Sequence, residues 1–205
     1  MSDMQRNHWE TVYSEGKMRF PQYDQWLEKH LAVLREASFV VDLGCGNGAD
    51  TVYLSNQGIR TIACDFSQAA LKQLKDILPE AKVLHFDMRE GLPFESDAAD
   101  VVIADLSLHY FHWQTTCFLV SEIFRTLTKN GVLLCRLNAL AEHRASKDEV
   151  EIEPHYYFVG DHSKRFFDEA DIRKLFDGHS IIGCSEGITT KYGGEKHLWE
   201  VIVKP

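Results

Sequence analysis

The sequence lacks paired cysteines, long apolar runs and an excess of basic charge. Its five cysteines are widely spaced and no Cys-x-x-Cys pair occurs, so we expect neither a disulfide framework nor a structural zinc site. The chain has 22 Lys and Arg residues against 31 Asp and Glu residues, a formal net charge of −9. This balance argues against non-specific binding of nucleic acid or anionic lipid, although a local basic patch is compatible with it. We predict no metal site and no nucleic-acid partner.

No segment has the composition of a membrane span or a signal peptide. The uncharged stretch 106–121 contains too many polar side chains for a bilayer core, and the first ten residues lack an apolar segment. We therefore predict a cytoplasmic protein without a membrane partner. An apolar content of 44% in 205 residues favours one folded domain over residues 1–205. Within it we expect a helical lead-in at 1–37 and an insertion at 139–165; the sequence does not indicate the oligomeric state.

Short apolar runs alternate with helix-length amphipathic segments. The predicted strands are 39–43, 59–64, 82–86, 101–104, 131–137, 180–184 and 198–203. The predicted helices are 49–57, 67–78, 114–128 and 168–176. This alternation predicts an α/β fold with a doubly wound, mostly parallel, seven-stranded sheet that ends in an antiparallel strand. Ligands of such sheets bind outside the carboxyl ends of the strands.

A glycine-rich loop follows the first predicted strand and opens the first helix of this alternation. It comprises Asp42, Gly44, Cys45, Gly46 and Gly48. Glycines permit positive φ angles and a close approach of the backbone to a ligand. The alternative reading is a tight turn from strand to helix. Its spacing, Gly-x-Gly-x-Gly, differs from the Gly-x-Gly-x-x-Gly of dinucleotide-binding loops, which argues against a nicotinamide-dependent oxidoreductase.

Four aspartates stand at the ends of the first four predicted strands: Asp42, Asp65, Asp87 and Asp105. One aspartate alone would be read as a turn or helix-cap residue. Four at successive strand ends are hard to explain by turns. A carboxylate after the second strand can accept hydrogen bonds from the vicinal hydroxyls of a ribose. We therefore expect a ligand site along this edge of the sheet.

Residues 41–48 resemble the first motif of the class I S-adenosylmethionine-dependent methyltransferases, and the resemblance extends from about Phe39 to Arg136. It implies S-adenosylmethionine as cofactor and S-adenosylhomocysteine as product. The glycine loop would approach the methionyl part, and Asp42 would order the loop and its contacts to the amino group. The remaining roles follow the same resemblance: Asp65 on both ribose hydroxyls, Phe66 beside the adenine, Asp87 on the adenine amino group, the Met88 N–H on a ring nitrogen, and Asp105 and Leu106 beside the sulfonium.

Two further segments resemble this superfamily. Trp9 and Tyr13 resemble a Trp-x-x-x-Tyr lead-in of small-molecule methyltransferases, in which Tyr13 would close over the carboxylate end of the cofactor. The alternative is an aromatic pair that packs the leading helix on the sheet. The segment after the fourth strand and Arg136 to Asn138 faintly resemble tellurite-resistance and thiopurine methyltransferases. A small-molecule acceptor is therefore expected.

Candidate acceptor residues lie after the fourth and fifth strands. His109 would accept a proton from the nucleophile, or serve in packing. Arg136 would meet an anionic acceptor, or pair with an acidic residue. The insertion 139–165 would form a lid or a surface excursion. The other predicted acceptor contacts are Tyr110, His112, Tyr156 and Tyr157. A non-catalytic partner or sensor that binds S-adenosylmethionine remains the alternative to an enzyme.

Overall fold

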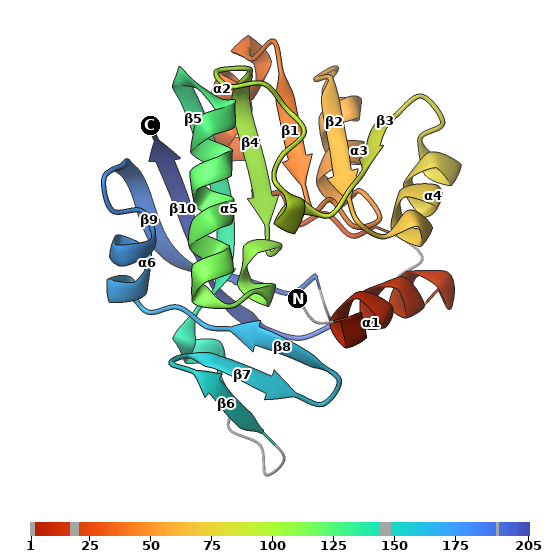
Figure 1. Cartoon of the computed structure of the whole chain (residues 1–205). Coiled ribbons are helices and arrows are strands. Elements are labelled where there is room, and N and C mark those ends of the chain that lie inside the picture. Colours follow the sequence, from red (N-terminus) through yellow and green to blue (C-terminus); the bar gives the residue numbers. More distant parts are fainter. Residues whose placement is uncertain (1–2, 17–20, 144–148, 192) are drawn as a thin grey trace.

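A computed structural model describes residues 3–16, 21–143, 149–191 and 193–205. It contains a seven-stranded sheet with the order β3-β2-β1-β4-β5-β10-β9 (Figure 1). Its strands are β1 (Val40–Leu43), β2 (Thr61–Asp65), β3 (Lys82–His85), β4 (Ala99–Asp105), β5 (Leu127–Asn138), β9 (Ser180–Thr189) and β10 (Lys196–Lys204). The first five are parallel, and β10 is antiparallel to both β5 and β9. The predicted fold class is confirmed.

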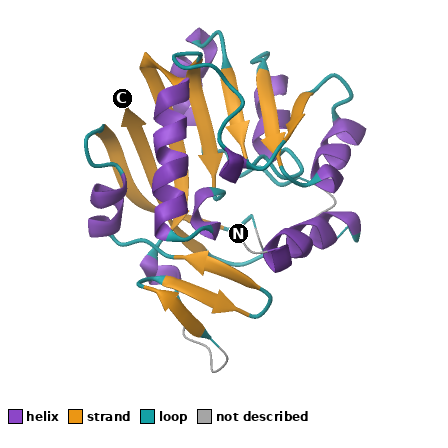
Figure 2. Cartoon of the chain, viewed as in Figure 1, coloured by secondary structure: helices purple, strands orange, loops and turns teal. Residues whose placement is uncertain are grey.

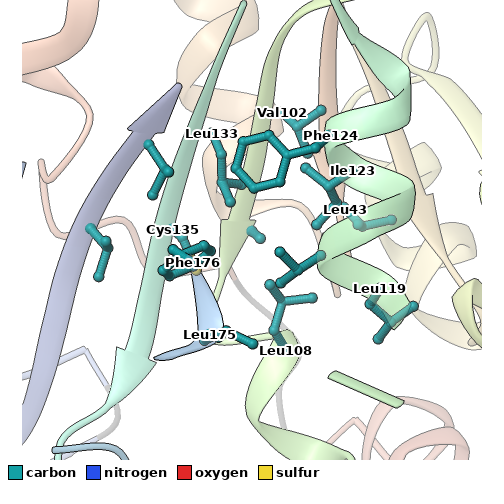
Figure 3. Close-up of a cluster of buried hydrophobic side chains, with 14 of the residues drawn as sticks. Leu43, Val102, Leu108, Leu119, Ile123, Phe124, Leu133, Cys135, Leu175 and Phe176 are labelled. Atoms are coloured by element: carbon teal, nitrogen blue, oxygen red, sulfur yellow. The ribbon is translucent and has the colours of Figure 1, made fainter. Parts of the chain in front are cut away.

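Both faces of the central strands are buried, which explains their continuous apolar sequence. Because side chains alternate along a strand, Val41 and Val102 point into one apolar cluster, whereas Val40 and Val101 point into another. Figure 3 shows the first cluster, in which Phe124 and other side chains of α5 lie over the strands.

Helices cover the two faces of the sheet (Figure 2). They are α1 (Asp3–Ser14), α2 (Leu31–Glu36), α3 (Ala49–Asn56), α4 (Gln68–Ile77), α5 (Trp113–Thr126) and α6 (Glu169–Leu175). Buried residues of α5 and α6 belong to the first cluster, and those of α2 and α3 to the second. At α4 the Ser67 side chain accepts a hydrogen bond from the Ala70 N–H at 3.1 Å, as expected of an N-cap.

Two local features differ from the sequence prediction. Helix α5 ends at Thr126 and β5 begins at Leu127, whereas the predicted helix ran to residue 128 and the predicted strand began at residue 131. The insertion 139–165 contains a second sheet with the order β6-β7-β8, where no strands were predicted. Its strands are β6 (Val150–Glu153), β7 (Tyr156–Val159) and β8 (His162–Arg165). Residues 144–148 of the insertion lie outside the described part of the chain.

Helix α1 and the small sheet lie near the carboxyl ends of the parallel strands (Figure 1). They contact each other through α1 and β8. Helix α1 belongs to the expected lead-in 1–37, and the sheet belongs to the insertion 139–165, for which a lid and a surface excursion were the two alternatives. Across the described residues, no helix combines the length and apolar character that a membrane span requires.

Candidate active site

A cavity of about 1040 Å³ lies at the carboxyl ends of the parallel strands. Small-molecule sites have volumes of roughly 300–1,000 Å³, so this cavity is at the upper end of that range. It contains eleven of the twelve predicted cofactor residues: Tyr13, Asp42, Gly44, Cys45, Gly46, Asp65, Phe66, Asp87, Met88, Asp105 and Leu106. Gly48 is absent from its lining. The sequence signals of four separate strands therefore converge on one site.

The glycine loop turns sharply against β2 at the base of this cavity. The N–H groups of Gly44 and Cys45 donate to the Cys64 carbonyl at 2.8 and 3.0 Å. Gly44 and Gly46 have φ angles of +75° and +55°, a region that favours glycine. A Cβ at Gly44 would collide with Ser107, and one at Gly46 would collide with the Tyr13 hydroxyl. Glycine is therefore required here both by the backbone conformation and by the space.

Asp65 ends β2 and fastens the loop. Its Oδ2 accepts the Gly46 N–H and its Oδ1 accepts the Ser67 N–H, both at 2.8 Å. Burial raises the pKa of Asp65 to about 6, although these hydrogen bonds oppose the increase. A carboxylate has about four acceptor positions, and backbone N–H groups, including that of Phe66, occupy up to three of them, so acceptor capacity remains for a ligand.

Asp42 and Asp50 add two more buried carboxyl groups to the cavity wall. Asp42 Oδ2 accepts a hydrogen bond from Thr51 Oγ1 at 2.6 Å, and Asp50 Oδ1 accepts one from Trp26 Nε1 at 3.0 Å. Burial raises the pKa of both carboxyl groups, and their negative neighbours raise it further. A cationic ligand would offset this cost, because an opposite charge favours the ionised form. The sequence prediction missed Asp50, which follows the loop by two positions.

Asp87 and Met88 follow β3 on the far side of Asp65. Burial works to raise the pKa of Asp87, but hydrogen bonds from Arg89 outweigh it and the pKa is lowered. Arg89 donates its backbone N–H and its Nε to the Asp87 carboxylate at 3.0 Å. Phe66, Met88 and Phe86 also line the cavity and give this part of it apolar surface.

Asp105 ends β4 and receives two cations. Arg136 donates to its carboxylate through Nε at 2.6 Å and Nη2 at 2.8 Å, and Lys191 Nζ donates at 2.5 Å. Burial would raise the pKa of Asp105, but Lys191 and Arg136 outweigh it and hold it below the usual range. The next residue, Leu106, has a φ of +53°, an uncommon angle for a residue other than glycine. Such backbone strain is concentrated at functional sites.

Arg136 itself does not belong to the cavity lining. Its side chain is buried, donates to Asp24 Oδ2 at 2.7 Å as well as to Asp105, and lies 4.6 Å from the Trp26 ring centre. Of the two roles predicted for Arg136, this geometry corresponds to pairing with acidic residues. Contact with an acceptor has no support from its position.

Helix α1 borders the cavity through Trp9 and Tyr13. Glu10 anchors the helix to the start of α4, because it accepts hydrogen bonds from the Ser67 hydroxyl at 2.6 Å and the Ala69 N–H at 3.3 Å. The Trp9 ring lies 5.2 Å from the Tyr110 ring, edge to face. The helix therefore connects the second strand end with the segment after β4.

His109 lies behind the cavity wall. It is fully buried, is absent from the lining, and neither ring nitrogen has a hydrogen-bond partner among the described residues. Burial lowers its pKa well below the usual range, and Lys196 and Lys164 lower it further, so the imidazole is neutral. Its predicted role as proton acceptor stays a prediction without a supporting contact.

Of the other predicted acceptor residues, one lines the cavity and three do not. Tyr110 lines the cavity, whereas His112, Tyr156 and Tyr157 do not. The Tyr156 hydroxyl donates to the Tyr110 carbonyl at 3.0 Å, and the Tyr157 ring stacks on His143 at 4.1 Å. These two tyrosines therefore support residues that do line the cavity. Their predicted contact with an acceptor has no support in their positions.

Three lysines of the cavity were not predicted from the sequence. Lys164 comes from β8, Lys191 follows β9 and Lys196 begins β10. The same wall includes Asn138, Glu142, His143 and Phe166. No short motif joins these residues, and only the topology brings them together. The cavity thus has an acidic half at the ends of β1 to β4 and a half that contains all of its lysines.

The sequence is similar to that of known methyltransferases. A family model described as a methyltransferase domain matches residues 41–135. The trans-aconitate 2-methyltransferase of Delftia acidovorans is 31% identical over 150 residues, which cover 70% of this chain and 55% of that protein. The chain spans about half the length of the first curated relatives that it matches.

Solved structures share the fold at low sequence identity. A SAM-dependent methyltransferase from Methanosarcina mazei has a TM-score of 0.77 and 16% identity, with 86% of this chain and 96% of that chain covered. The 1,6-didemethyltoxoflavin-N1-methyltransferase of Burkholderia thailandensis, solved with 1,6-didemethyltoxoflavin and S-adenosylhomocysteine bound, has a TM-score of 0.72 and 18% identity. The match covers 98% of this chain and 87% of that chain. The family model shows a methyltransferase domain at residues 41–135, and the motifs and the shared fold are those of the class I S-adenosylmethionine-dependent methyltransferases.

Proposed function

We propose that this protein transfers a methyl group from S-adenosylmethionine to a small-molecule acceptor. The observation that carries the proposal is the single cavity that gathers the glycine loop and the four strand-end aspartates. The match to a methyltransferase domain over this same region supports it.

The residues of the cavity fit this cofactor in shape and in charge. The glycines of the loop present backbone without side chains to the cavity, and Asp65 retains acceptor capacity for ribose hydroxyls. Asp42 and Asp50 carry raised pKa values that a cationic amino group and a sulfonium would lower again. The proposed pose puts the methionyl end at the glycine loop and the adenine beside Phe66.

The chemistry requires little more from the protein than positioning. When bound, S-adenosylmethionine supplies an electrophilic methyl group, and the acceptor displaces it in line from the sulfonium. Holding the two reactants in a productive geometry can supply a large part of the acceleration. Tyr13 and Trp9 on α1 would cover the cofactor, and Tyr110 would border the acceptor. An acceptor that is already an anion would need no proton removed, which agrees with the position of His109 outside the lining.

The relatives suggest the first acceptors to assay. Several are named trans-aconitate 2-methyltransferases, so trans-aconitate and other small carboxylic acids belong at the head of the panel. The assay measures S-adenosylhomocysteine formed with each acceptor, with protein alone as the blank. We expect formation that depends on the acceptor and is lost in Asp65→Ala. S-adenosylmethionine that binds but is never consumed, with this panel or with a cell extract, would favour a non-catalytic binding protein and contradict the proposal.

A further inference from the structure

The lysine-containing half of the cavity has a chemical character that the cofactor does not explain. Lys164 and Lys196 both line it and are both half-buried. Burial lowers the pKa of Lys196 to about 8, and the charge of Lys164 contributes to the decrease. Burial also lowers the pKa of Lys164. Two ammonium groups thus share a partly dry wall at a cost in free energy that a bound anion would offset.

The acidic groups around the two lysines are largely engaged elsewhere. Asp105 is shared by Arg136 and Lys191. Glu142, the other carboxylate near both lysines, accepts the His197 N–H at 2.8 Å. Among the described residues, the Lys164 side chain forms no hydrogen bond or ion pair. Lys164 therefore brings to this wall a positive charge that no ion pair within the described residues balances.

Topology separates the two lysines from the proposed cofactor pose. Lys196 begins β10, which lies three strands from β1 in the sheet order, and the glycine loop follows β1. With neighbouring strands about 4.8 Å apart, this separation is roughly 14 Å. Lys164 lies on β8, which contacts the turn that carries His109 and Tyr110 after β4. Both lysines therefore lie where an acceptor would enter, beyond the sulfonium position beside Asp105.

We infer that Lys164 and Lys196 bind an anionic group of the methyl acceptor, a carboxylate or a phosphate, and so select acidic small molecules. The inference rests on the proposed function in one respect, namely that the bound anion is the methyl acceptor. The anion site itself can be tested without assuming methyl transfer. Ammonium groups suit both kinds of anion, since they act as compact point charges with several donors.

The test is calorimetric titration of the protein with citrate, with inorganic phosphate and with the uncharged triethyl citrate. Each titration is done with and without saturating S-adenosylhomocysteine. The variants are Lys164→Met, Lys196→Met and the double variant. Lys204→Met is the matched control, because Lys204 is exposed at the other end of β10. We expect citrate or phosphate to bind at millimolar concentration and triethyl citrate not to bind. Each of the two single variants, Lys164→Met and Lys196→Met, should lower the affinity for the anion about tenfold, in line with the loss of one charge-assisted hydrogen bond.

The outcomes separate this inference from the proposed function. Affinity for S-adenosylhomocysteine should stay unchanged in the lysine variants, which also shows that they are folded. If the affinity of these variants for S-adenosylhomocysteine falls as strongly as their affinity for citrate, the lysines bind the cofactor carboxylate and the inference is wrong. Absence of anion binding to the wild type, or equal binding by wild type and double variant, would overturn it too. A wild type that binds anions but not S-adenosylhomocysteine would contradict the proposed function alone.

Discussion

Asp65 offers the sharpest test of the cofactor pose, because one side chain joins the glycine loop to the expected ribose. In Asp65→Ala a ligand loses a charged hydrogen-bond acceptor, which costs about 1.5–3 kcal/mol. This corresponds to a dissociation constant raised roughly 10- to 150-fold. The same change leaves the N–H groups of Gly46 and Ser67 without their acceptor, so we also expect a loss of stability of about 1–3 kcal/mol for each unpaired group.

The pKa of Asp65 adds a pH dependence to the same measurement. Ribose hydroxyls donate to the ionised carboxylate, so binding favours the charged form over the protonated form. Because the pKa of Asp65 is raised to about 6, affinity for S-adenosylhomocysteine should be constant above about pH 7. It should fall as the pH decreases through 6, and Asp65→Asn should remove this part of the decrease.

The assay is calorimetric titration with S-adenosylhomocysteine from pH 5 to pH 8, with Asp100→Ala as the matched control. Asp100 also accepts two backbone N–H groups, those of Ser38 and Phe39, but it lies at the opposite end of the sheet outside the cavity. The control should lose stability and keep its affinity. If Asp65→Ala and Asp100→Ala bind equally well, the ribose assignment is refuted.

Three further predictions concern the loop, the core and the buried ion pair. Gly46→Ala should lower the affinity for S-adenosylhomocysteine at least tenfold in a calorimetric titration. The new Cβ would collide with Tyr13, and the positive φ at this position disfavours alanine. Wild-type affinity in this variant would contradict the tight fit. Leu119→Ala, at a fully buried position of α5, should lower the free energy of unfolding in urea by about 2–5 kcal/mol, and a loss well below that range would argue against the packing. Arg136→Met should lower the free energy of unfolding by about 3–5 kcal/mol in the same measurement, because Asp105 and Asp24 both lose a buried cationic partner. If the Arg136 variant has normal stability and a raised KM for the acceptor, Arg136 contacts the acceptor and its pairing role is not the main one.

The parallel sheet could be predicted because strands that are buried on both faces have continuous apolar sequences. Residues 40–43 and 99–105 have almost no exposed surface, so their sequences are recognisable without any partner strand. The strand-end aspartates were recognisable for a related reason, since Asp42, Asp65 and Asp105 lie within or at the end of such runs. The meeting of these aspartates at one edge of the sheet could therefore be predicted, whereas their contacts with a cofactor stay a prediction.

Residues that depend on long-range topology were not predicted. Strand β6 alternates apolar and acidic residues over only four positions and is largely exposed, so neither the strand nor its pairing with β7 was predicted. Lys164, Lys191 and Lys196 come from three elements, and a lone lysine normally indicates a solvated surface. Arg136 meets Asp24 across 112 positions of the chain, a distance that no local pattern spans.

The most direct test of the account is a crystal structure of the protein with S-adenosylhomocysteine. The account predicts the ribose hydroxyls within about 2.5–3.0 Å of the Asp65 carboxylate oxygens. It also predicts the adenine beside Phe66 and Met88 and the amino acid end at the glycine loop. A ligand bound outside this cavity, or with its ribose away from Asp65, would contradict the account.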